Sequence, residues 1–169
     1  MPYGAFDDEP QQLAAKSPGR VTRLFFMRSA GYLIVNREDR QEELDDGMNQ
    51  MSDYYVDKVS LDGTVTRLGS KRALTMISCD AEGQSSTTTG DVITAYPSPD
   101  GRLIARVDTD TNCQRQNATI TFLAADSLRM IGTPFTTTHS NAQLQLVEYS
   151  WLESGRFAQV KMSFQGPVG

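Results

Sequence analysis

The clearest structural signal in this chain is the stretch Tyr96-Pro97-Ser98-Pro99-Asp100-Gly101-Arg102-Leu103-Ile104-Ala105-Arg106-Val107. Its central Pro-Asp-Gly separates two runs of apolar and β-branched residues, which is typical of two strands joined by a tight turn. Proline presets the backbone at the start of such a turn, and glycine accepts the positive φ that the turn needs. The stretch therefore predicts a β-hairpin.

Further hairpins are predicted on both sides of this stretch. Asp62-Gly63, between the β-rich runs 54–61 and 64–68, is the strongest short-range hairpin signal in the sequence. Ser29-Ala30-Gly31 separates two β-rich runs near the N-terminus, and Glu153-Ser154-Gly155 separates two near the C-terminus. No segment has the periodicity of a long helix. The chain is therefore predicted to be all-β and mainly antiparallel.

The remaining segments are predicted from their polarity. Residues 1–20 combine acidic, Gln, Pro and Gly residues with little apolar content, which predicts a flexible tail before a single β domain at 21–169. Residues 38–52 are acidic and predict a solvated loop, with one or two helical turns ending near Gly47 as the alternative. The Ser- and Thr-rich residues 80–90 predict an exposed loop.

Two local features indicate where a sheet ends and where it is buried. Pro134 cannot donate to a central ladder, so the run before it predicts an edge strand. Tyr96, Tyr149 and Trp151 occupy equivalent strand ends and predict packing between sheets, with a partner for the indole N–H; the alternative is a role as surface binding anchors.

Three of the hairpin turns repeat one pattern. Gly31, Gly101 and Gly155 are each followed by a long polar or aromatic residue, then by a large and a smaller apolar residue. Antiparallel strands in repeated groups of four are typical of propeller blades and related arrays. The pattern therefore predicts an internal repeat.

The middle copy carries Ser98-Pro99-Asp100-Gly101-Arg102 directly after an aromatic strand end. On this turn the chain, over about residues 21–162, resembles the TolB-like, WD-repeat-like β-propeller family. The last copy keeps Ser150-Trp151 and Gly155-Arg156, whereas the first keeps only its glycine. The resemblance implies four-stranded blades, protein–protein contact as the usual use, and a periplasmic or secreted location.

The spacing of the copies departs from a compact propeller. The glycines at 31, 101 and 155 are 70 and 54 residues apart, against about 40 to 45 residues for one blade. Two complete four-stranded units and part of a third fit, whereas a closed propeller needs about four blades or more. We therefore expect an incomplete or open array whose unpaired edges bind another protein or another copy of the chain.

Composition excludes two classes of partner. The formal net charge is −5, and nucleic-acid-binding proteins instead gather Lys and Arg on one face. Apolar runs are all far shorter than the ~18 residues of a membrane span. The N-terminal residues lack the basic and apolar regions of a signal peptide, which leaves the cytoplasm as an alternative location.

Asp108, Asp110 and Asn112 form the best ligand-like cluster. Their oxygen-bearing side chains alternate along the chain and suit a hard cation such as calcium. The pattern departs from an EF-hand, since Cys113 stands where the turn glycine belongs and Thr119 where the bidentate Glu belongs. The alternative is a strand end capped by Asx turns, with no metal.

The two cysteines, Cys79 and Cys113, are 34 residues apart and lack the CxxC spacing of a zinc site. Two predictions stay open: a pair of reduced thiols, or a disulfide in an exported protein. The disulfide would stabilise the fold by about 3 to 4 kcal/mol.

The sequence offers no catalytic motif. His139 lies in a Thr-rich run, and there is no Gly-x-Ser-x-Gly elbow, phosphate loop or dinucleotide fingerprint. We therefore predict no cofactor and a non-enzymatic protein-binding or scaffolding module that uses sheet edges and the loops at 38–52 and 80–90. The alternatives are an accessory propeller segment of a larger hydrolase and a calcium-dependent surface or adhesive domain.

Overall fold

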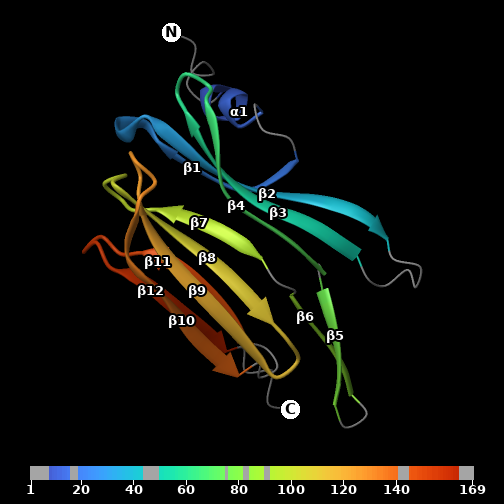
Figure 1. Ribbon diagram of the computed structural model, residues 1–169. Helices are drawn as coiled ribbons and strands as arrows, with labels where there is room; N and C mark the ends of the chain where they lie inside the picture. Colours follow the sequence, from blue (N-terminus) through green and yellow to red (C-terminus); the bar gives the residue numbers. More distant parts are fainter. Residues whose placement is uncertain are drawn as a thin grey trace.

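The computed structural model describes most of the chain, and most of the described part is β-strand (Figure 1). The described strands pair antiparallel into two four-stranded sheets and two separate hairpins. This confirms the predicted all-β fold with antiparallel four-stranded, blade-like sheets in an open arrangement. The described residues are 8–15, 19–43, 50–74, 76–81, 84–89, 92–140 and 145–163.

The first sheet is a meander in which each strand pairs with the next one along the chain, in the order β1-β2-β3-β4. A short 3-10 turn over Arg28–Ala30 joins the first two strands and ends at Gly31. The predicted Asp62-Gly63 turn joins the last two. The strands are β1 (Arg20–Met27), β2 (Tyr32–Glu43), β3 (Gln50–Ser60) and β4 (Val65–Leu74).

The second sheet repeats the same meander. Its order is β10-β9-β8-β7, so its first and last strands are its two edges. The predicted Ser98-Pro99-Asp100-Gly101 turn joins β7 to β8, and β10 is an edge strand, as Pro134 predicts. The strands are β7 (Ile93–Pro97), β8 (Leu103–Thr111), β9 (Arg115–Ala124) and β10 (Met130–Ser140).

Two hairpins complete the described strands. One lies between the two sheets in sequence, and the other follows the second sheet and contains the predicted Glu153-Ser154-Gly155 turn. The first hairpin extends beyond the end of β4 (Figure 1). Its strands are β5 (Met76–Ala81) and β6 (Gln84–Thr89), and those of the second are β11 (Gln145–Trp151) and β12 (Phe157–Ser163).

The three repeated turns share a backbone geometry. Gly31, Gly101 and Gly155 have φ of 78°, 72° and 84°, a region that residues with a Cβ rarely adopt. In each turn the glycine N–H donates to the carbonyl three residues earlier, at Arg28, Ser98 and Leu152. Each turn also joins the first strand of a sheet or hairpin to its second strand, so the sequence repeat coincides with a structural one.

Two predicted loops are largely strand, which corrects the sequence analysis. Within 38–52, β2 extends to Glu43 and β3 begins at Gln50; residues 44–49 lie outside the described part. The charged side chain of Glu38 is compatible with a buried position in β2, because Arg20 and Ser52 donate hydrogen bonds to its carboxylate. Within 80–90, the β5–β6 hairpin replaces the loop, since the Thr run has strand propensity that outweighs its polarity.

The predicted flexible tail at 1–20 is also corrected in part. Asp8–Ala14 forms helix α1, which packs on the outer face of the first sheet. Ala14 is buried there with Leu33, Val35 and Val59, and the Arg37 guanidinium donates to the Ala14 carbonyl at the end of the helix. The sequence signal is weak because only a few apolar side chains anchor so short a helix. Residues 1–7 and 16–18 lie outside the described part.

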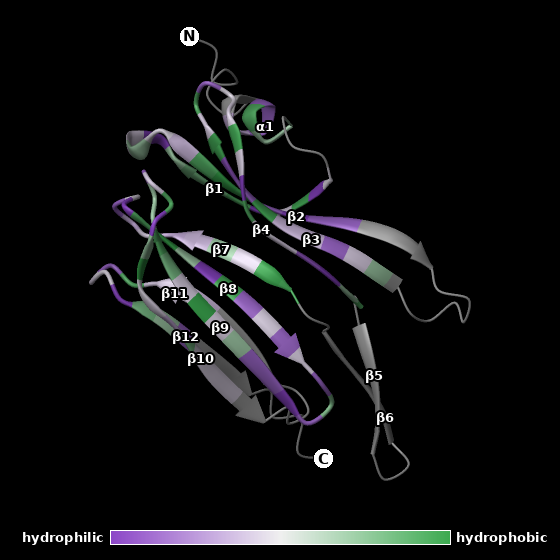
Figure 2. Cartoon of the chain, in the orientation of Figure 1, coloured by the Kyte–Doolittle hydropathy of each residue, from purple (hydrophilic) through white to green (hydrophobic). Residues whose placement is uncertain are grey.

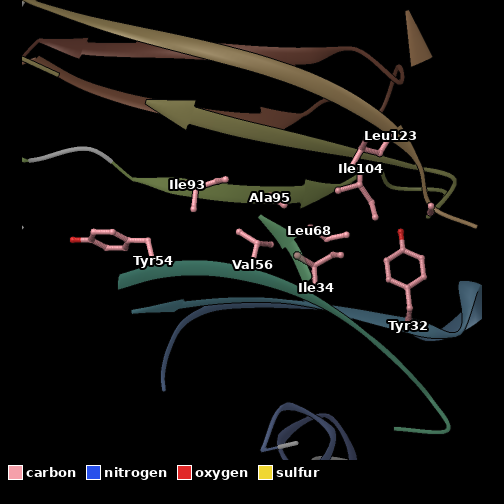
Figure 3. Packing of buried hydrophobic residues seen from close by; sticks show 10 residues of the cluster. Tyr32, Ile34, Tyr54, Val56, Leu68, Ile93, Ala95, Ile104 and Leu123 are labelled. Atoms are coloured by element: carbon pink, nitrogen blue, oxygen red, sulfur yellow. The ribbon is translucent and has the colours of Figure 1, made fainter. Parts of the chain in front are cut away.

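The main core lies between the two four-stranded sheets, which pack face to face (Figure 3). Ile93 and Ala95 point from β7 toward Ile34, Val56 and Leu68 of the first sheet. Hydrophobic and hydrophilic residues are interspersed along the strands (Figure 2). From Ala105 to Thr111 of β8 every second residue is buried, whereas β2 begins with the continuous apolar run Tyr32-Leu33-Ile34-Val35, which is buried on both faces of the sheet. The β11–β12 hairpin covers the other face of the second sheet, so three β layers follow one another.

Candidate functional site

The free edge of β10 is the main candidate site. β10 pairs with β9 on one side, and no described strand pairs with its other side. Three large apolar side chains on this strand are unusually exposed: Met130 at 50%, Ile131 at 46% and Phe135 at 46%. Contiguous exposed apolar residues mark interaction surfaces more often than isolated ones do. We call Met130, Ile131 and Phe135 the β10 apolar edge.

Local sequence explains why β10 changes character along its length. The register with β9 shifts between Ile131 and Phe135, around Gly132 with φ of 69° and Pro134, which lacks an N–H. From Phe135 to Ser140 the pairing with β9 is unbroken. The second half of β10 therefore offers a regular edge, and the first half adds apolar side chains beside it.

The β10 apolar edge connects to an aromatic cluster beneath it. The ring of Phe135 stacks on Phe122 at 6.2 Å, and Phe122 meets Trp151 and Phe157 edge-on at 5.7 and 5.9 Å. These contacts join the second sheet to the β11–β12 hairpin. Phe135 is therefore held on a packed base, although almost half of it is exposed.

The predicted packing role of three aromatic residues is confirmed. Tyr96 and Tyr149 are buried, Trp151 is half-buried, and all three lie in the cluster between the second sheet and β11–β12. The indole N–H of Trp151 donates to the Tyr96 carbonyl at 2.8 Å, so it has the partner that the sequence analysis required.

Asp108, Asp110 and Asn112 have protein contacts that suit the alternative to a metal. Asp108 accepts from the Lys71 ammonium at 2.6 Å. Asn112 Oδ1 accepts the backbone N–H of Gln114 at 2.8 Å and of Arg115 at 2.9 Å, which is an Asx turn. Asp108 and Asp110 share a face of β8 but are about 7 Å apart along it. Among the described residues, no group of three or more His, Cys, Asp or Glu gathers as a metal site would.

The two cysteines lie on different elements. Cys79 is in β5, and Cys113 is exposed in the turn between β8 and β9. No cysteine of the described part is a free thiol. The side chain of Cys79 lies outside that part, so its pairing with Cys113 stays a prediction.

His139 is in β10 opposite Gln116, not in a loop, because the surrounding Thr residues favour a strand. Its side chain lies outside the described part. In the part of the chain that the structure covers, no helix has the length and apolar run needed to cross a membrane.

No family model, curated protein or solved structure matches this chain.

The β10 apolar edge was missed by the sequence analysis, although the edge position of its strand was predicted from Pro134. The signal available was the pair Met130-Ile131 followed by Gly, Thr and Pro, an apolar start to a strand that cannot lie in the middle of a sheet. Whether these side chains are exposed depends on which other elements pack against them, and the residues of β10 alone do not indicate this.

Proposed function

We propose that this protein is a non-enzymatic protein-binding module that receives an extended segment of a partner along the β10 edge. The observation that carries the proposal is the joint presence of an open strand edge and three side chains exposed to about half their area, Met130, Ile131 and Phe135. The partner is another protein or a second copy of this chain.

Strand addition explains how such an edge would bind. An incoming strand gains affinity from main-chain hydrogen bonds and specificity from its alternate side chains. The regular segment from Phe135 to Ser140 supplies the hydrogen-bonding edge, and Met130, Ile131 and Phe135 supply the apolar contacts. Burying the exposed half of three large side chains contributes a few kcal/mol, enough to favour a specific partner.

The opposite edge of the same sheet is less suited to a partner. β7 packs against the first sheet, and the Asn36 side chain hydrogen-bonds both the backbone N–H and the backbone carbonyl of Ala95. Of the two edges of the second sheet, only β10 therefore combines an unpaired backbone with exposed apolar side chains.

We further propose that the chain is a segment of a propeller-like array. Support comes from the stacked meanders and from the common glycine geometry at Gly31, Gly101 and Gly155. In the same reading the protein is periplasmic or secreted and Cys79 bonds to Cys113, a pairing that the lack of a free thiol in the described part favours.

Site-specific photo-crosslinking tests the proposed binding edge. A photoreactive benzoylphenylalanine is placed at Ile131 in cells that make the protein, and at Leu61 as the control. Leu61 is 43% exposed, close to the 46% of Ile131, and lies in the β3–β4 turn. We expect a defined protein adduct, of a second copy or of another polypeptide, at Ile131 alone. Equal adducts at both positions, or none at Ile131, would contradict the proposal.

A further inference from the structure

A pocket opens where the first strands of three β layers meet, away from the β10 edge. Its volume is about 460 Å³, and side chains of β1, β2, β7 and β11 line it. The lining therefore combines both four-stranded sheets and the last hairpin, and exists only when the three layers are stacked. The lining residues are Thr22, Arg23, Asn36, Thr94, Tyr96, Tyr149 and Ser150.

Arg23 is the charged group of this pocket. Its guanidinium carbon lies 5.6 Å from the centre of the Tyr96 ring and 5.9 Å from that of Phe25, so two aromatic rings hold it in place. Among the described residues, no carboxylate lies within ion-pair distance of Arg23. In a chain of net charge −5, this arginine is a cation without a described internal counter-charge.

Two tyrosine hydroxyls add neutral donors. The Tyr96 hydroxyl accepts from Thr94 Oγ1 at 3.3 Å, and the Tyr149 hydroxyl accepts from Gln159 Nε2 at 3.0 Å. A phenol that accepts in this way keeps its own proton to donate. A phenol is protonated at neutral pH, and burial raises the pKa of Tyr149 further.

Most of the other polar groups of the pocket are already engaged. The Asn36 side-chain amide hydrogen-bonds the backbone N–H and carbonyl of Ala95, and the Thr22 hydroxyl donates to the backbone carbonyl of Asn36 at 3.1 Å. The donors left for a ligand are therefore one guanidinium, two phenols and the Ser150 hydroxyl, with no acid among the described lining residues to repel an anion.

We propose that this pocket binds the carboxylate of an anionic ligand, with Arg23 as the charged anchor and Tyr96 and Tyr149 as neutral donors. A guanidinium offers two parallel N–H groups that match the two oxygens of a carboxylate. A phosphate, with its higher charge, normally recruits several cations or a group of backbone N–H donors, which this pocket does not offer among its described residues. The ligand is either a small carboxylic acid or an acidic segment of a protein.

The single tryptophan of the chain provides the readout. Trp151 follows Ser150 of the pocket lining, and its indole donates to the carbonyl of Tyr96. Tryptophan fluorescence of the full chain is titrated, at constant ionic strength, with succinate and with the peptide Gly-Asp-Glu-Gly, which is acetylated at its N-terminus and amidated at its C-terminus. Succinamide and Gly-Asn-Gln-Gly, acetylated and amidated in the same way, serve as the uncharged counterparts, and inorganic phosphate as the competing anion.

We expect a saturable fluorescence change with the carboxylates alone, weakened about tenfold or more in Arg23→Gln. Arg23→Lys keeps the positive charge but lacks the two parallel N–H groups of the guanidinium, and it should bind with intermediate strength. Arg129→Gln is the matched control, since Arg129 is exposed and outside the pocket, and should bind like the wild type. Circular dichroism verifies that each variant is folded.

The two sources of carboxylate are separated by affinity. Tighter binding of the acidic peptide assigns the pocket to a protein segment, and equal or tighter binding of succinate assigns it to a small acid. The proposal is overturned if neither gives a saturable change, if the uncharged counterparts or phosphate bind as well, or if Arg23→Gln binds like the wild type. These outcomes are independent of crosslinking at Ile131, because the pocket and the β10 edge share no residue.

Discussion

The side-chain amide of Asn36 in β2 hydrogen-bonds both the backbone N–H and the backbone carbonyl of Ala95 in β7. Asn36 Nδ2 donates to the Ala95 carbonyl at 3.1 Å, and Asn36 Oδ1 accepts the Ala95 N–H at 2.8 Å. Asn36 is only 2% exposed and Ala95 is fully buried. One side chain thus replaces a neighbouring strand at the inner edge of the second sheet. This closes the β7 edge, whereas the β10 edge stays open.

Replacing Asn36 should destabilise the fold strongly. In Asn36→Ala the Ala95 N–H and carbonyl stay buried without partners, which should lower the free energy of unfolding by about 2 to 4 kcal/mol. Urea unfolding followed by circular dichroism measures the change. Asn117→Ala is the control, because the Asn117 side chain bonds Thr138 at the surface, and it should cost less than about 1 kcal/mol. If the two variants lose the same free energy of unfolding, the buried Asn36–Ala95 hydrogen bonds stabilise the fold no more than a surface hydrogen bond does.

Charges on the β10 apolar edge should abolish association without unfolding the protein. We expect the wild type to associate as its concentration rises, and Ile131→Lys with Phe135→Lys to remain monomeric, because lysine on an edge strand blocks pairing. Sedimentation velocity measures the association state. Leu61→Lys is the control of similar exposure and should associate like the wild type. A wild-type chain that stays monomeric at high concentration would exclude a second copy as the partner.

The buried hydroxyl of Tyr32 should make stability depend on alkaline pH. It donates to the Gly101 carbonyl at 2.8 Å, and burial, together with the Asp100 carboxylate, raises the pKa of Tyr32 to about 12. The folded pKa lies above the unfolded value of about 10, so this contribution is complete below pH 10. It is lost as the pH rises from 10 to 12, by about 2 kcal/mol.

Urea unfolding at several pH values between 9 and 12 tests this loss. Tyr32→Phe lacks the ionisable group, so its free energy of unfolding should fall less steeply than that of the wild type over this range. The variant also lacks the hydrogen bond to the Gly101 carbonyl, which lowers its free energy of unfolding by the same amount at every pH below 10. The difference in slope above pH 10 therefore reports the ionisation of Tyr32 alone. Parallel curves for the two proteins would contradict the assignment.

The predicted bond between Cys79 and Cys113 should add to stability. Cys113→Ser should lower the free energy of unfolding by about 3 to 4 kcal/mol, since the bond closes a long loop in the unfolded chain. Alkylation followed by mass measurement should label the two thiols only after reduction. As the control, wild type and variant should unfold alike in the presence of reductant. Labelling of both thiols without reduction would exclude the bond.

Calcium should leave the melting temperature unchanged. Asp108 is already paired with Lys71, and Asn112 Oδ1 is bonded to two backbone N–H groups, so an added ion would have to displace these partners. Melting is followed with and without millimolar calcium. A calcium-dependent rise in the melting temperature that disappears in Asp110→Asn would instead establish the metal site.

Local sequence was sufficient to predict many of the strands and the turns around four glycines. Gly31, Gly63, Gly101 and Gly155 all have positive φ, as the turns predicted around them require. Pro134 placed β10 at an edge, because a residue without an N–H cannot serve a central ladder. These features depend on a few adjacent residues, so a local pattern is sufficient to predict them.

Which of these elements meet follows from long-range packing and could not be predicted from local patterns. The acidic end of β2 is a strand because Arg20 and Ser52 pair with Glu38 from neighbouring strands, and α1 is placed by its contacts with the first sheet. The pocket joins Arg23 of β1, Tyr96 of β7 and Tyr149 of β11, which are more than 50 residues apart from one to the next. Likewise, Asn36 meets Ala95 across 59 residues. Contacts of this range follow from how whole sheets stack, and stacking is set by the sum of all buried side chains rather than by any one segment.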